Sequence, residues 1–115
     1  NSNCVLAGDI GGTHARLALA HRHAGRIALV RQRIVPVQAF PTAQSAIADF
    51  LNGEPMPPHA CLAWAGPIHD TRARLTNGAW EIDTDAVASA FGATSIALVN
   101  DFYAAAAAID RALKK

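Results

Sequence analysis

The chain has 115 residues, of which 51% are hydrophobic and 17% charged, and this balance excludes an intrinsically disordered protein and suits a single domain over 1–115. Ten basic residues face nine acidic ones, and the formal charge of +1 excludes the strongly basic surface that nucleic-acid binding needs. No apolar run approaches the roughly 18 residues of a membrane-spanning helix, so we expect no membrane partner.

The chain begins with short β-prone runs that are joined by glycine-bearing turns. The runs occupy 5–10, 15–20 and 27–37, and they are rich in Val, Ile, Leu and Ala. They predict an antiparallel meander of three strands, which Pro36 and Pro41 close.

From residue 42 the spacing of the apolar residues becomes helical. Thr42 is a good helix cap, and Asn52 with Gly53 predicts the end of the helix. The apolar positions between them are Ala46, Ile47, Phe50 and Leu51. A strand over 61–65 is expected next, and 72–76 predicts a short strand across from it.

The remaining third of the chain alternates between helix and strand. Asp83 caps a predicted helix that Gly92 ends, 95–99 predicts a strand, and the alanine-rich segment 102–113 predicts a last helix. The predicted order is therefore β-β-β-α-β-α-β-α, which is an α/β fold with a mixed sheet.

Gly11 and Gly12 directly follow the first predicted strand. Because they have no side chains, they let backbone N–H groups approach a phosphate closely, and Thr13 adds a hydroxyl donor. Asp9, at the end of the strand, can hold Mg²⁺ directly or through water. The Gly-Lys-Ser/Thr of a P-loop does not follow, and a tight hairpin turn also explains these residues.

Asn100 and Asp101 stand between a predicted strand and a predicted helix. Helix capping explains the pair, and so does catalysis in which Asp101 takes a proton from an attacking hydroxyl while Asn100 positions the same substrate. Sites in α/β proteins lie at the carboxyl ends of strands, and both Asp9 and Asp101 are predicted to follow such ends.

A third group of candidate residues follows the predicted strand at 61–65 and precedes Asp83, the cap of the second predicted helix. Gly66 lets backbone approach a ligand, and the amide of Asn77 suits a sugar hydroxyl. A hairpin with polar turn residues also explains this pattern. Trp64 and Trp80 are candidates either for stacking on a sugar or for packing in the core.

Four blocks of the sequence resemble, in the same order and at similar spacing, blocks of bacterial glucokinases. They are AGDIGGT with ARLAL at 7–13 and 15–19, AGPI at 65–68, LTN with Trp80 at 75–77, and VNDF at 99–102. The resemblance covers nearly the whole chain. It implies the small N-terminal domain of that family, with the ribonuclease-H-like fold that sugar kinases share with heat-shock ATPases and actin.

The resemblance also implies a role for each candidate residue. The reaction that it implies is ATP-dependent phosphoryl transfer to the 6-hydroxyl of glucose, the first step of glycolysis. In that reaction Asp101 is implied to be the base, and Asn100 is implied to bind glucose. Asn77 is then favoured as a residue on the sugar side. A first phosphate loop, which binds ATP with Mg²⁺, is implied to consist of Asp9, Gly11, Gly12 and Thr13.

Two departures from the family pattern bear on function. His14 stands where an asparagine is expected after Gly-Gly-Thr, and its larger ring affects the geometry of a bound phosphate. The second phosphate loop, the adenosine-binding segment and a Glu-Gly-Gly-His block are missing, so we expect this chain to be inactive alone and to need a C-terminal domain as partner. The alternative is a non-catalytic, sugar- or nucleotide-binding regulatory module of the same superfamily.

Three further features predict where the protein acts and how it associates. Cys4 and Cys61 stand in apolar runs and predict buried thiols of a cytoplasmic protein rather than a disulfide framework. The first residues lack a basic region followed by an apolar run, so we expect no signal peptide. An alanine-rich surface that meets a larger domain in the family, including 102–113, predicts a homodimer of the isolated chain.

Overall fold

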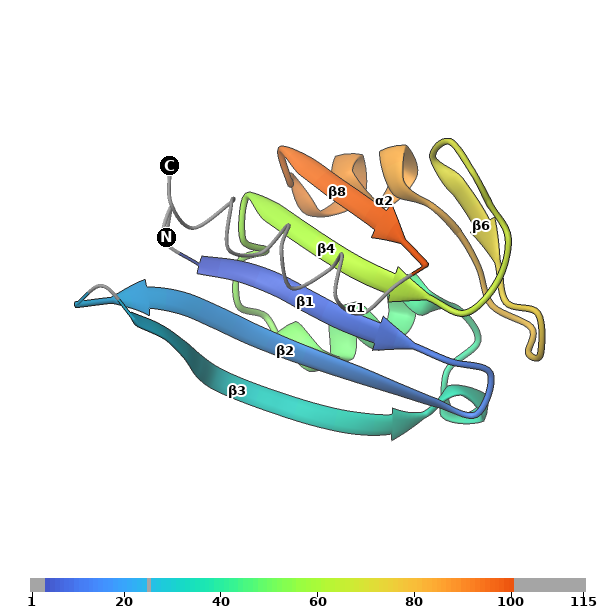
Figure 1. The fold of residues 1–115 in the computed structure, drawn as a ribbon, viewed down its shortest axis with the longest axis horizontal. Coiled ribbons are helices and arrows are strands. Elements are labelled where there is room, and N and C mark those ends of the chain that lie inside the picture. Colours follow the sequence, from blue (N-terminus) through green and yellow to red (C-terminus); the bar gives the residue numbers. More distant parts are fainter. Residues whose placement is uncertain (1–3, 25, 101–115) are drawn as a thin grey trace.

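The computed structural model describes residues 4–24 and 26–100 (Figure 1). Its strands are β1 Cys4–Ile10, β2 His14–His23, β3 Arg26–Pro36, β4 His59–Trp64, β5 Ile68–His69, β6 Arg72–Arg74, β7 Glu81–Asp83 and β8 Ser95–Val99. The helices within these ranges are α1 Ala43–Leu51 and α2 Thr84–Phe91, with a 3₁₀ turn at Val37–Ala39. The predicted helix 102–113 lies outside the described residues.

The large sheet has five strands in the order β3-β2-β1-β4-β8. The first three strands of the chain pair antiparallel, which confirms the predicted meander, whereas β1, β4 and β8 run parallel. The fold is therefore mixed α/β, as predicted. A register shift at Leu19 and Ala20 leaves Val30 of β3 outside the pairing.

The central strand β1 is apolar on both faces, as expected for a strand that is covered on both sides. One face directs Leu6 and Ile10 into the main core, to which α1 contributes Phe50 and α2 contributes Val87. Figure 1 shows both helices on the same side of the large sheet. On the opposite face Val5 is also buried, whereas Asp9, near the carboxyl end of the strand, is exposed.

A second, three-stranded sheet in the order β5-β6-β7 corrects one prediction. The short strand expected over 72–76 does form, as β6, but it pairs with β5 and β7 and not with the strand at 61–65. The cause is local: Asp70 adopts a left-handed backbone, φ 61°, and closes a two-residue turn that folds β6 back onto β5. Asp tolerates this conformation better than most residues, so β6 pairs with its neighbour in the chain, β5, through a tight hairpin.

The ends of both helices agree with the predictions. Thr42 caps α1 by accepting from the Ser45 N–H, Ser45 returns the bond, and Asn52 ends the helix in a left-handed conformation. Asp83 caps α2, and Gly92 ends it with φ 74°. Within the described part of the chain, no helix is long and apolar enough to cross a membrane.

The parallel strands bring the candidate residues to one edge of the large sheet. Ile10 lies beside Trp64, and Ala63 lies beside Val99, so β1, β4 and β8 end at the same edge. In Figure 1 this edge is on the right, where β6 also lies. Because sites in α/β proteins lie at such edges, this end of the sheet positions the candidate site.

Candidate functional site

The turn at residues 11–13 joins β1 to β2 and presents unused donors. The Gly11 N–H donates to the His14 carbonyl at 3.0 Å, and the Thr13 carbonyl accepts from the Val37 N–H at 2.9 Å, so the turn is held at both ends. Within the described residues, the N–H groups of Gly12 and Thr13 donate to no protein acceptor. Two adjacent free N–H groups in a turn form the kind of concave donor site that binds phosphate oxygens.

Asp9 lies near the end of β1 with its side chain exposed. Its register partners are Ala63 on β4 and Arg16 on β2, and the side chain of Arg16 is exposed as well. Residues that lie opposite each other in an antiparallel pair share a face of the sheet. The guanidinium of Arg16 is therefore on the same face as the carboxylate of Asp9. Arg16 is not among the residues predicted from the sequence. Its signal in the sequence is the alternation of the polar residues His14 and Arg16 with the apolar Ala15 along β2.

The metal prediction for Asp9 is compatible with its surroundings. Over residues 4–24 and 26–100, no three His, Cys, Asp or Glu side chains gather into a metal site. Mg²⁺ in phosphate-binding sites is commonly held by one or two carboxylates, with waters and substrate phosphates as the other ligands. A single exposed carboxylate beside free N–H donors fits that pattern, so Asp9 stays a predicted Mg²⁺ ligand.

The turn at 11–13 packs directly against the loop that carries Asn77. A Cβ atom added to Gly12 would lie 1.9 Å from the carbonyl oxygen of Asn77 and 2.9 Å from its Cβ. From the other side, a Cβ added to Gly78 would lie 3.3 Å from the Gly12 carbonyl oxygen. Glycine at position 12 is therefore required by this backbone contact, besides any phosphate that the turn binds.

Gly66 makes a similar contact on the opposite side of the Asn77 loop. A Cβ added to Gly66 would lie 2.0 Å from the Arg74 carbonyl oxygen and 2.9 Å from the Thr76 nitrogen. The Thr76 N–H donates to the Ala65 carbonyl at 3.1 Å. Gly66 thus allows a close approach to β6 and to the loop after β6. The role of Gly66 in binding a ligand stays a prediction.

Asn100 connects the ends of β4 and β8. Its Nδ2 donates to the Trp64 carbonyl at 3.0 Å and to the Gly66 carbonyl at 2.8 Å. Since both acceptors are carbonyls, the amide orientation is determined, and both of its hydrogens are used. The group that Asn100 can offer to a ligand is therefore Oδ1, an acceptor for a hydroxyl. Asp101, the predicted base, lies outside the described residues.

The structure brings together the predicted residues that it describes. The turn after β1, the loop after β4, the loop after β6 and the end of β8 meet through the contacts above, and they carry Asp9, Gly11, Gly12, Thr13, Gly66, Asn77 and Asn100. The chemistry of this set is that of a ligand with phosphate at one end and hydroxyls at the other. Backbone donors suit the phosphate, and amides suit the hydroxyls.

Both tryptophans belong to the core rather than to the surface of this site. Trp64 and Trp80 are each 1% exposed, so packing, and not stacking on a sugar, is their role. The Trp80 indole N–H donates to the Phe40 carbonyl at 2.9 Å, whereas the buried Trp64 indole N–H has no acceptor among residues 4–24 and 26–100. The two indoles differ in hydrogen bonding but not in burial.

This difference predicts unequal effects of the same substitution. Trp80→Phe should lower the free energy of unfolding by about 1 kcal/mol more than Trp64→Phe does, because among the described residues only Trp80→Phe removes a hydrogen bond, the one to the half-buried Phe40 carbonyl. Both changes remove the same volume, so each variant controls for the other. Urea unfolding of the two variants measures the difference, and equal losses of stability would contradict the hydrogen-bond argument.

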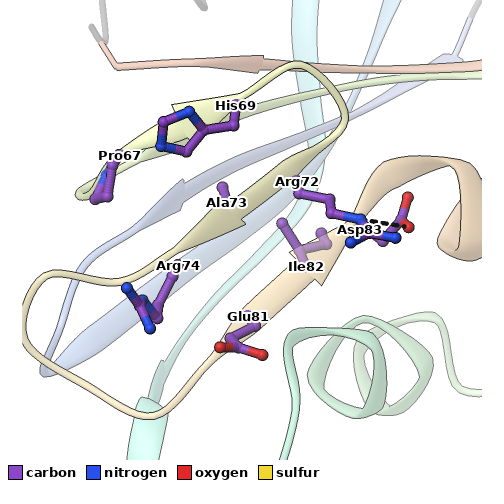
Figure 2. A pocket seen from close by; sticks show the side chains of 8 residues that line it. All are labelled: Pro67, His69, Arg72, Ala73, Arg74, Glu81, Ile82 and Asp83. Carbon is purple, nitrogen blue, oxygen red and sulfur yellow. Dashed lines mark ion pairs between the residues drawn. The ribbon is translucent and has the colours of Figure 1, made fainter.

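A hollow of about 480 Å³ lies on the small sheet and is separate from the predicted site residues (Figure 2). Figure 2 shows His69, Arg72, Arg74, Glu81 and Asp83 around it. Arg72 and Asp83 form an ion pair at 3.4 Å, with the arginine side chain 80% exposed, so the pair contributes little to stability. Charged side chains surround the hollow, and none of the predicted catalytic or binding residues lines it.

The cysteines agree only in part with the expectation of buried thiols. Cys4 and Cys61 form no disulfide with each other, and Cys61 is opposite Ala7 in the sheet rather than opposite Cys4. Cys61 is buried as predicted, whereas Cys4 is only half-buried. Burial raises the pKa of the Cys4 thiol, so this group stays protonated and unreactive near neutral pH.

Comparisons with known proteins agree with one another. The glucokinase family model matches residues 6–115. The glucokinase of Chromohalobacter salexigens is 43% identical over 104 residues, which are 89% of this chain and 32% of that protein. Thus the chain spans about one third of the length of such relatives.

Solved structures of glucokinases share the fold. The crystal structure of a glucokinase from an Antarctic psychrotroph has a TM-score of 0.79 at 33% identity, covering 90% of this chain and 34% of that one. A glucokinase from Balamuthia mandrillaris in complex with glucose has a TM-score of 0.53 at 25% identity, covering 85% of this chain and 29% of that one. Because the family model spans nearly the whole sequence, the chain belongs to the glucokinase family.

Proposed function

We propose that this chain is the N-terminal part of an enzyme that transfers a phosphoryl group from ATP to the 6-hydroxyl of glucose. The observation that carries the proposal is the pair of free N–H groups at Gly12 and Thr13, at the same sheet edge as Asp9 and Asn100. Phosphoryl transfer depends mainly on positioning and charge stabilisation, and this edge supplies groups for both.

The proposed phosphate side consists of the turn after β1. The N–H groups of Gly12 and Thr13 bind phosphate oxygens of ATP, and Asp9 holds Mg²⁺, directly or through water. The bound Mg²⁺ supplies neutralisation of the phosphate charge. The N–H of Gly11 is engaged by the His14 carbonyl, so Gly11 shapes the turn rather than donating to the ligand.

The proposed sugar side consists of Asn77, Gly66 and Asn100. The Oδ1 of Asn100 accepts from a sugar hydroxyl while its Nδ2 holds the loop after β4. Asp101, the next residue, is the proposed base that takes the proton from the attacking hydroxyl. Glucose as the sugar is supported by the glucose complex of the Balamuthia mandrillaris relative.

The wider organisation follows from the same proposal. The sheet order β3-β2-β1-β4-β8, with an antiparallel meander and two parallel additions, supports a ribonuclease-H-like fold. We propose that 1–115 is one domain and that the complete protein adds a C-terminal domain with the second phosphate loop. Cys4 and Cys61 form no disulfide with each other, which supports action in the cytoplasm, where thiols stay reduced.

The experiment compares this chain with a complete enzyme, made by joining residues 1–115 to the remaining two thirds of the Chromohalobacter salexigens relative; we name this protein the joined enzyme. In a coupled assay with glucose and MgATP, the 115-residue chain should show no measurable turnover, and the joined enzyme should be active. Robust turnover by the chain alone, lost in Asp101→Ala, would contradict the need for a second domain. Glucose binding without turnover by the joined enzyme would favour the regulatory module.

We also propose that the isolated chain forms a homodimer, and the described residues suggest a surface for it. The exposed large hydrophobic residues among them all lie on the edge strand β3: Leu29 at 61%, Val30 at 55% and Ile34 at 56%. The nearby Arg31 and Arg33 are paired with Glu54 and Asp49, so their charge does not prevent a second copy from approaching. An exposed apolar edge strand is a template for such pairing.

Sedimentation over a wide concentration range tests this surface. Ile34→Lys should weaken self-association by about tenfold or more, because it places a charge in the apolar contact. Gln44→Lys is the matched control, since it adds the same charge to an exposed position on α1, outside β3. Equal effects of the two changes, or a monomer at all concentrations, would exclude β3 as the interface.

A further inference from the structure

The phosphate turn and the sugar-side loop lie in close contact, mainly through backbone atoms. The position that a Cβ of Gly12 would occupy is 1.9 Å from the Asn77 carbonyl oxygen, and that of Gly78 is 3.5 Å from the Gly12 Cα. Gly78 adopts φ 146°, a conformation that side chains rarely allow. The two segments are therefore packed as closely as main chain permits, and neither can shift toward the other.

This contact is the first link of a continuous series. Thr76, directly before Asn77, ties this loop to the end of β4, since its N–H donates to the Ala65 carbonyl at 3.1 Å. The end of β4 is tied to Asn100, whose side-chain Nδ2 donates to the Gly66 carbonyl at 2.8 Å. The contact at Gly12 and the bond from Thr76 thus involve backbone atoms, and the side chain of Asn100 supplies the last link.

We propose that Gly12 is a positioning residue for the sugar side of the site and that nucleotide binding and sugar binding are coupled through its contact with Asn77. The inference rests on the proposed function, in which Gly12 donates to phosphate and Asn77 lies beside the sugar. Because the two loops are in contact, a ligand that fixes the position of one loop also restrains the other. The second ligand then binds beside a loop that is already held in place, which gives positive cooperativity.

The test uses the joined enzyme and compares Gly12→Ala with Gly11→Ala. Both substitutions add one methyl group to the same turn, but a Cβ on Gly11 would meet only the His14 carbonyl oxygen, at 3.3 Å, and would not reach the Asn77 loop. Calorimetry measures the Kd of glucose with and without a non-hydrolysable ATP analogue. The ratio of the two Kd values is the coupling, which is commonly about 5- to 150-fold in coupled sites.

Gly12→Ala should weaken glucose binding by about tenfold in the absence of nucleotide and bring the coupling ratio close to one. Gly11→Ala should leave glucose binding without nucleotide within about twofold of the unsubstituted protein. A folded Gly12→Ala variant with unchanged glucose affinity and unchanged coupling would overturn the inference. Loss of nucleotide affinity alone would overturn it too, because the glycine would then serve only the phosphate.

A reciprocal variant covers the case in which Gly12→Ala does not fold. Gly78→Ala lies outside the phosphate turn, and its Cβ would press on the Gly12 carbonyl oxygen from the sugar side. Because coupling is reciprocal, this change should weaken binding of the ATP analogue by about fivefold or more. Unchanged nucleotide affinity in a folded Gly78→Ala protein would contradict the coupling.

A measurement without ligands separates this inference from the proposed function. If the unsubstituted joined enzyme binds neither glucose nor the ATP analogue, the proposed function fails, and the contact is then judged in the 115-residue chain by amide NMR spectra. Gly12→Ala should shift the amide signals of residues 76–80 and the side-chain amide of Asn100, while Gly11→Ala should leave them in place. Unmoved signals in Gly12→Ala would refute the positioning role as well.

Discussion

Replacing Asp101 with asparagine should lower kcat of the joined enzyme by a factor of about 10² to 10⁴, the usual contribution of a general base. The carboxylate removes the proton of the attacking hydroxyl, and an amide cannot accept it. Asparagine caps helices as well as aspartate does, so the variant should fold normally. Coupled-assay kinetics and thermal unfolding of the same preparation measure the two effects separately.

Asp83→Asn is the matched control for this prediction. Asp83 caps α2 by accepting from the Asp85 N–H at 3.1 Å, and it is not one of the predicted site residues. The same aspartate-to-asparagine change at a helix N-terminus should therefore leave kcat unaltered. If Asp101→Asn instead lowers the melting temperature strongly and keeps kcat, Asp101 is a cap and not the base.

Gly66→Ala should destabilise the folded chain by about 3 kcal/mol. Its Cβ would lie 2.0 Å from the Arg74 carbonyl oxygen, so the backbone of β6 must move. That movement also strains the bond from the Thr76 N–H to the Ala65 carbonyl. Backbone atoms cannot rotate out of the way as a side chain can, so relief is costly.

Gly53→Ala separates this clash from the general effect of replacing glycine. Gly53 has φ 86°, and a Cβ there would meet nothing within 4 Å, so only the left-handed conformation is penalised, by about 1 kcal/mol. Urea unfolding of both variants gives the comparison. A loss at Gly66 no larger than that at Gly53 would mean that β6 yields easily and that the two loops are not closely packed.

Much of the architecture was predictable because its determinants are local in the chain. The ends of α1 depend on Thr42 and Asn52, and each acts on backbone within four residues of itself. The same holds for Asp83 and Gly92 around α2. Apolar runs bounded by glycine turns likewise predicted the main strands, and with them the placement of the candidate residues at strand ends.

The sequence by itself also determined which residue types stand at the strand ends: the carboxylate of Asp9, the bare turn after it and the amide of Asn100. Only the tertiary structure decided what these groups do for one another. Gly12 contacts Asn77, and Asn100 uses both amide hydrogens on carbonyls of distant residues. Such contacts depend on which remote backbone segments the sheet brings together. Neither the spacing of residues nor their secondary-structure propensity along the chain specifies these contacts.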